Sequence, residues 1–148
     1  MATVVPLTGL AATIVLVEDD AALVEVLKEA LQGKGYAVWH APTGAQGEAL
    51  VAEVDPDLIL LDLILPDMSG LVLCANLKAR ARAPIIVVSG TRRAEERILA
   101  FKLGADDFIT KPFDIDELEA RVEALLRRAA AGRPSRPHPR APSASATW

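Results

Sequence analysis

The sequence predicts an α/β protein in which five parallel strands form one sheet with helices on both faces. Short apolar runs alternate five times with longer segments whose apolar residues recur at helical spacing. Parallel strands joined in this way need crossover connections, which cover both faces of the sheet. At 148 residues, the length suits one domain better than two.

The first two strand–helix pairs follow directly from the pattern. Residues 13–17 are apolar and β-branched, as expected for a strand buried on both faces, and the acidic residues after them end it. Leucine, valine and alanine recur at helical spacing over 21–32, where Gly33 supplies the stop. Residues 36–40 are expected to form the second strand, and Thr43 can cap a helix that ends near Val54.

Three further pairs complete the pattern. The third strand ends at Asp62 and the fourth at Ser89, and Gly104 closes the fourth helix. Asp114 and Glu117 have the spacing of a capping box at the start of the last helix. These elements are expected over strands 58–61, 85–88 and 108–110 and over helices 71–79, 94–103 and 114–128.

Charge and cysteine content narrow the function classes. Residues 1–126 carry 20 acidic and 11 basic side chains, whereas 127–148 carry five arginines and no acid. An acidic body argues against direct nucleic-acid binding by the domain. The single Cys74 excludes an internal disulfide and a thiolate zinc site. It fits a reducing compartment, so we expect a cytoplasmic protein.

Two end segments are expected to flank the folded domain, 13–128. Residues 1–12 are apolar but lack the basic start of a signal peptide and contain Pro6 and Gly9, so we interpret them as a short leader and expect no membrane association. Residues 129–148 are rich in arginine, proline, serine and alanine. This composition predicts a disordered tail or linker.

Polar side chains stand at the carboxyl ends of four strands, where sites form in parallel sheets. They are Glu18 and Asp19, Asp62, Ser89 and Lys111. Carboxylates brought together repel one another unless a cation is present, which predicts an oxygen-ligand site for Mg²⁺. Lysine and a hydroxyl suit the oxygens of a phosphoryl group. The set predicts phosphoryl transfer onto Asp62, with an acyl phosphate as product.

Bacterial response-regulator receiver domains resemble this chain over about residues 13–128, in the blocks IVLVEDD, LILLDLILPDMSG, IIVVSG and GADDFITKPF. The resemblance implies a flavodoxin-like, CheY-like fold with strand order 2-1-3-4-5. It also implies that Asp62 accepts a phosphoryl group from a sensor histidine kinase, assisted by Lys111 and Ser89. Such a domain is a signalling phosphoacceptor and not an enzyme, although it assists its own phosphorylation and dephosphorylation.

The resemblance further implies the metal ligands and a switch. Many members have aspartate where this chain has glutamate at position 18, and the longer acid more often reaches the metal through water. Phosphorylation would draw Ser89 inward, and Phe108 would fill the vacated space. The Lys111-Pro112 bond is expected to be cis. The implied ligands of Mg²⁺ are Glu18, Asp19, Asp62 and the backbone carbonyl of Ile64.

The block GADDFITKPFDIDELEARVEALLRR is most similar to the OmpR/PhoB-type branch, whose receivers dimerise through the fourth helix, fifth strand and fifth helix. A DNA-binding domain normally follows the receiver in this branch, so transcriptional output through an effector domain absent from this chain is expected. If this region forms no dimer interface, its charged residues would be a solvated surface with weak ion pairs. The implied pairs across the two-fold axis are Arg97 with Glu117, Asp107 with Arg121 and Lys102 with Glu123, and Asp106 belongs to the same face.

Alternatives remain for function and for single residues. The chain could be a stand-alone receiver that acts by protein–protein contact, or an interaction domain that is never phosphorylated. Two other classes are argued against. A haloacid-dehalogenase-like phosphatase needs a second aspartate where this chain has Ile64. A flavin-binding module needs phosphate-cradling loops where this chain has acidic residues. Asp20 is as well explained by helix capping, Asp67 is interpreted as a loop carboxylate, and His40 as a structural residue.

Overall fold

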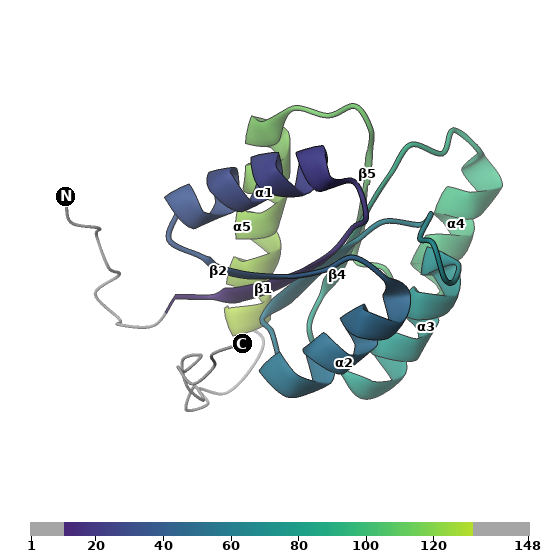
Figure 1. Ribbon diagram of the computed structural model, residues 1–148, viewed down its shortest axis with the longest axis horizontal. Coiled ribbons are helices and arrows are strands. Elements are labelled where there is room, and N and C mark those ends of the chain that lie inside the picture. Colours follow the sequence, from purple (N-terminus) through teal and green to yellow (C-terminus); the bar gives the residue numbers. More distant parts are fainter. Residues whose placement is uncertain (1–10, 132–148) are drawn as a thin grey trace.

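The predicted sheet is present: in the computed structural model, which describes residues 11–131, five parallel strands lie in the order β2-β1-β3-β4-β5 (Figure 1). No helix among these residues is both long and apolar enough to cross a membrane. The strands are β1 (Thr13–Val17), β2 (Ala37–Ala41), β3 (Leu58–Leu61), β4 (Ile85–Ser89) and β5 (Asp107–Thr110). The helices are α1 (Ala21–Gly33), α2 (Gly44–Val54), α3 (Gly70–Arg80), α4 (Ala94–Lys102) and α5 (Ile115–Ala131).

Element boundaries agree closely with the sequence pattern, and α5 differs most. It continues to Ala131, three residues beyond the predicted end, because residues 129–131 are alanines, which favour helix. The rest of the expected tail, 132–148, and residues 1–10 of the expected leader lie outside the described residues.

Side chains of each strand alternate between two hydrophobic layers. Val15, Ile59 and Val87 belong to the layer that packs with α2 and α3, and Ile14 and Leu60 belong to the layer that packs with α1 and α5. Figure 1 shows α1 and α5 on one face of the sheet and α2, α3 and α4 on the other. Burial on both faces explains why the three central strands, β1, β3 and β4, are almost entirely apolar, whereas the two edge strands are only partly buried.

Capping side chains hold the helix starts at the carboxyl edge of the sheet. Asp20 caps α1, as expected, by accepting from the N–H groups of Ala22 and Leu23 at 3.0 and 3.2 Å. Thr43 caps α2 and Ser69 caps α3. The capping box expected at α5 does not form, because its glutamate binds an arginine of the same helix. The loops above the carboxyl edge are therefore anchored mainly at α1, α2 and α3.

Gly47 lets α2 approach β1 closely. A Cβ atom at this position would lie 2.8 Å from Cγ2 of Val17, which is fully buried. A Cβ atom at Gly33, at the end of α1, would have no heavy atom within 4 Å. The two glycines therefore differ in packing, although both lie in helices.

We expect Gly47→Ala to lower the free energy of unfolding by about 1–2 kcal/mol, because overpacking outweighs the gain in helix propensity. Gly33→Ala should raise it by up to about 1 kcal/mol, because only the propensity gain applies there. Urea unfolding followed by circular dichroism measures both values. Equal effects of the two substitutions would contradict the packing argument.

Candidate functional site

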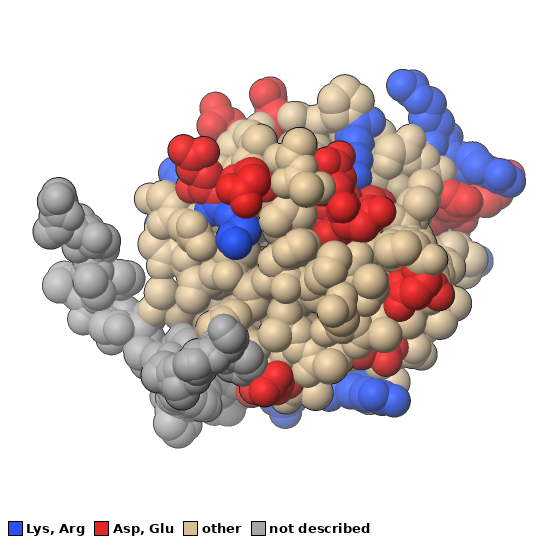
Figure 2. Space-filling model, viewed as in Figure 1, with Lys and Arg blue, Asp and Glu red and all other residues tan. Residues whose placement is uncertain are grey.

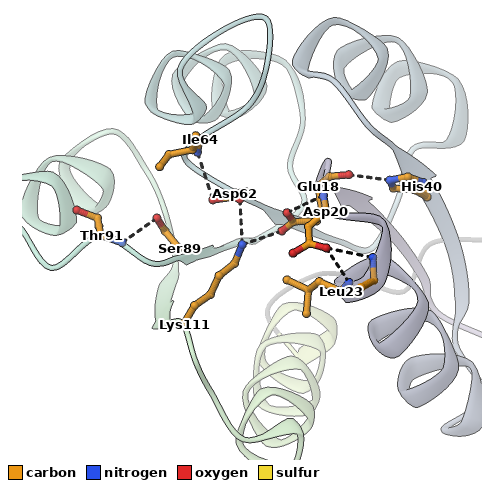
Figure 3. A network of polar contacts seen from close by, with 10 residues as sticks. Glu18, Asp20, Leu23, His40, Asp62, Ile64, Ser89, Thr91 and Lys111 are labelled. Atoms are coloured by element: carbon orange, nitrogen blue, oxygen red, sulfur yellow. Dashed lines mark hydrogen bonds and ion pairs between the residues drawn. The ribbon is translucent and has the colours of Figure 1, made fainter.

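The sheet topology delivers polar side chains from three strands to one point. Beyond the strand ends, the backbone N–H of Glu18 donates to Ala41 (3.1 Å) and that of Asp62 donates to Val17 (3.1 Å). The N–H of Lys111 donates to the carbonyl of Ser89 (2.9 Å). These bonds continue the ladders and fix where the side chains emerge. Figure 3 shows the side chains of Glu18, Asp62 and Lys111 pointing toward one another.

Three predicted metal ligands lie together. One carboxylate oxygen from each of Glu18, Asp19 and Asp62 lies within 4.8 Å of the others. Glu18 and Asp62 are buried, at 2% and 6% exposed, and Asp19 faces solvent. Hard oxygen donors with one open side are the set that Mg²⁺ prefers, so the residues present fit this ion.

Lys111 bridges the two buried carboxylates. Its Nζ lies 3.0 Å from Asp62 Oδ2 and 3.2 Å from Glu18 Oε1 (Figure 3). Burial lowers the pKa of the lysine, but the hydrogen bond and charge of Asp62, together with Glu18, outweigh it and raise the pKa above the ordinary value. The ammonium therefore stays charged and supplies a fixed positive charge beside Asp62.

Glu18 is held in an unfavourable environment for its charge. Burial and the neighbouring Asp62 charge raise its pKa from 4.5 to about 7, against the opposing effects of Lys111 and the N–H of Asp20. Near neutral pH the carboxyl is therefore only partly ionised. A divalent cation bound beside it would favour the ionised form. His40 binds the backbone carbonyl of Glu18 through Nε2 at 2.8 Å, which agrees with the structural role expected for it.

The loop after β3 shapes the other side of the site. The N–H of Ile64 donates to Asp62 Oδ1 at 3.2 Å, and the Ile64 side chain is 71% exposed. A Cβ at Gly70 would lie 2.2 Å from the carbonyl oxygen of Asp62, so only glycine lets α3 begin this close. The sequence marked this segment only as a loop, because the contact joins residues eight positions apart.

The two expected switch residues are both buried. Ser89 is fully buried, and its Oγ accepts from the N–H of Thr91 at 3.3 Å (Figure 3). Phe108 is 8% exposed, and its ring centroid lies 6.4 Å from that of Phe101. Both side chains are therefore enclosed by neighbouring residues, and their role as a switch stays a prediction.

Charged residues of the expected dimer face pair within the chain. Arg121 binds Asp107 at 3.0 Å and Glu117 at 3.0 Å, whereas the sequence suggested a partner across a two-fold axis for Asp107. The hydrogen bonds to Asp107 and then Glu117 raise the pKa of Arg121. Asp106 instead accepts from the N–H of Ile85 and from Lys78. Asp106 thus anchors the start of β4 and pairs with a lysine of α3, and its place in the dimer face stays a prediction.

The remaining residues proposed for this face lie on α4 and α5: Arg97, Lys102 and Glu123. On the face shown in Figure 2, acidic side chains gather in the upper part of the view, and basic ones project at the upper right. Among residues 11–131, the side of the molecule drawn in Figure 2 carries no continuous basic patch of the kind that duplex binding uses.

Comparisons with known proteins agree with this geometry. Residues 14–123 match the family described as the response regulator receiver domain. The DNA-binding dual master transcriptional regulator RpaA of Synechocystis sp. is 40% identical over 118 residues, covering 78% of this chain and 49% of RpaA. The DNA-binding response regulator MtrA of Mycobacterium tuberculosis is 43% identical over 115 residues, covering 78% of this chain and 50% of MtrA. The chain spans about half the length of these curated relatives.

Solved structures of receiver domains are also similar to this chain. The BeF3-activated receiver domain of Klebsiella pneumoniae RstA matches with a TM-score of 0.75 and 33% identity, covering 78% of this chain and 98% of that one. A CheY-like receiver domain protein of Methanospirillum hungatei matches with a TM-score of 0.78 and 30% identity, covering 82% of this chain and 98% of that one.

The raised pKa of Glu18 predicts how stability depends on pH. Between 4.5 and about 7 the unfolded chain loses its Glu18 proton before the folded chain does, so this group lowers stability as the pH rises. Glutamine stays neutral throughout. We therefore expect Glu18→Gln to match wild type near pH 4.5 and to exceed its free energy of unfolding at pH 8 by up to about 3 kcal/mol without Mg²⁺. Urea unfolding at both pH values tests this, and a variant less stable than wild type at pH 8 would contradict it.

Proposed function

This chain belongs to the response regulator receiver domain family, and on that premise we propose that Asp62 accepts a phosphoryl group from a sensor histidine kinase. The observation that carries the proposal is the position of Lys111 Nζ, 3.0 Å from Asp62 Oδ2 and 3.2 Å from Glu18 Oε1. The ammonium supplies positive charge directly beside the carboxylate that would become phosphorylated, which suits the oxygens of a transferred phosphoryl group. The clustered carboxylates around it suit the metal ion that such a transfer uses.

In the proposed step, a carboxylate oxygen of Asp62 attacks phosphorus, the oxygen–phosphorus bond forms, and the bond from phosphorus to the kinase imidazole nitrogen breaks. The imidazole leaves with the electron pair of that bond. Lys111 neutralises charge on the transferred oxygens, and the hydroxyl of Ser89 can donate to one of them. Mg²⁺, when held by Glu18, Asp19 and Asp62 with the carbonyl of Ile64, supplies further charge neutralisation for the phosphoryl group.

The proposed output is a change on the α4, β5 and α5 face that promotes dimerisation. Ser89 and Phe108 would link this face to the site, with the phosphoryl group shifting a population between two arrangements. Arg97 with Glu117, Asp107 with Arg121 and Lys102 with Glu123 are the pairs proposed across the axis. Exposed apolar side chains on α4, Ile98, Leu99 and Phe101, add apolar area to it.

The similarity to RpaA and MtrA places the chain in the OmpR/PhoB-type branch. Both relatives are named as DNA-binding regulators and are about twice as long as the matched region. We infer that the output of this receiver is transcription, exerted through a DNA-binding domain and not by direct contact of residues 11–131 with DNA. The buried free Cys74 suits the reducing cytoplasm in which this would occur.

We expect wild type to gain one phosphoryl group when incubated with acetyl phosphate and Mg²⁺, and Asp62→Asn to gain none, because the amide is not a nucleophile of this kind. Intact-protein mass spectrometry measures the adduct.

Asp20→Asn is the matched control for this experiment. It removes a carboxylate next to the site, but asparagine still caps α1, so phosphorylation should continue as in wild type. No adduct on a folded wild-type chain would refute the proposal and favour an interaction domain.

A mixing experiment separates pairing between chains from the pairing seen within one chain. After phosphorylation, Arg121→Asp and Asp107→Arg should each be monomeric, because like charges would face each other twice across the axis. Mixed together, they should form a heterodimer in which both pairs are opposite in sign. Light scattering after size exclusion reports the mass, and a mixture that stays monomeric would contradict the proposed pairing.

A further inference from the structure

The loop that follows β3 is tied to the start of α2 by Asp67. The carboxylate accepts the backbone N–H of Gly44 at Oδ1 (2.8 Å) and that of Ala45 at Oδ2 (2.9 Å). These are the first two residues of α2, whose N–H groups have no partner within the helix. A negative charge at this end also interacts favourably with the helix dipole. The bonds from Ala45 and Gly44 lower the pKa of Asp67, so the carboxylate stays ionised at neutral pH.

Packing reinforces the same contact. A Cβ at Gly44 would lie 2.5 Å from Cγ of Met68, so the Met68 side chain lies directly on the first residue of α2. Two neighbouring loop residues therefore dock at one point, one through hydrogen bonds and the other through packing. The position of this part of the loop is set by α2.

The other end of the loop holds the phosphoacceptor. Gly70 donates its N–H to the carbonyl of Leu63 at 2.7 Å, and Ile64 and Ser69 form an antiparallel bridge, so the loop closes on itself. Within this closed loop the N–H of Ile64 donates to Asp62 Oδ1 at 3.2 Å. A displacement of the docked part would therefore reach the carboxylate that is expected to attack phosphorus.

We propose that Asp67 is a positioning residue for phosphoryl transfer. It fixes the loop to α2, and the loop in turn orients the Asp62 carboxylate through Ile64. This inference rests on the proposed function and adds a residue that touches none of the reacting atoms. Misplacement of reacting groups by about 1 Å can slow a reaction by about a hundredfold, so a lost anchor should be visible in the rate.

The experiment compares Asp67→Ala and Asp67→Asn with Thr43→Ala. Thr43 caps the same end of α2 through the N–H of Gln46 and its side-chain hydrogen bonds stay within this helix start, so its removal takes away a cap and none of the bonds that hold the loop. For each protein the rate of phosphorylation at saturating acetyl phosphate, the apparent affinity for Mg²⁺ and the free energy of unfolding are measured. Circular dichroism checks that each variant is folded.

We expect Asp67→Ala to slow phosphorylation about tenfold at saturating Mg²⁺ and to weaken Mg²⁺ binding, because the carbonyl of Ile64 moves with the loop. Asp67→Asn keeps one acceptor oxygen and should lie between alanine and wild type. Thr43→Ala should stay within about twofold of wild type in rate, although it is also destabilised.

Three outcomes would overturn the inference. A wild-type rate in Asp67→Ala would show that the anchor does not position Asp62. Equal slowing in Thr43→Ala would show that only helix stability matters. If Asp67→Ala does not fold, a wild-type rate in Asp67→Asn would have the same meaning. Each of these outcomes requires that the wild-type chain is phosphorylated. If the wild-type chain is not phosphorylated, the proposed function itself fails, and the inference fails with it.

Discussion

The Lys111 ammonium reaches two buried carboxylates that lie on strands distant from its own. In the sheet order, β5 is separated from β3 by β4, and neighbouring strands lie about 4.8 Å apart. Only a long, flexible cationic side chain can span that gap and still contact Asp62 and Glu18 together. Without it, these two carboxylates, which are 2% and 6% exposed, would face each other uncompensated. The arrangement of the edge therefore depends on this one contact.

The rest of the fold serves this edge by being rigid. The side chains of β1, β3 and β4 are buried on both faces, and α1, α2 and α3 are capped where they begin beyond the strand ends, so the loops that carry the site have little freedom. α4 differs from the other helices. Its N-cap, Arg93, makes no side-chain bond, and among its residues only Ala100 is buried. A helix with one buried residue and no side-chain cap suits the rearrangement that we propose for α4.

Sequence reasoning was most successful where function depends on strand order and strand ends. The sheet, the gathering of Glu18, Asp19, Asp62 and Lys111, and the cis Lys111-Pro112 bond were all predictable and are all present. The contact between the loop after β3 and the start of α2 was not predictable, because no sequence pattern connects Asp67 with the first residues of that helix. Glu117 and Arg121 are four residues apart in α5, a spacing from which their pairing could have been predicted. Whether Asp107 pairs within its own chain or across a two-fold axis depends on three-dimensional distances, which the sequence does not give.

The central claim is that, among several crowded carboxylates, Asp62 alone forms the acyl phosphate. Borohydride reduces an acyl phosphate to an alcohol, so trapping of the phosphorylated chain followed by peptide mapping identifies the modified residue. We expect homoserine at position 62 and unchanged acids at positions 18 and 19. A reduced side chain at Glu18 or Asp19, with Asp62 intact, would contradict the account.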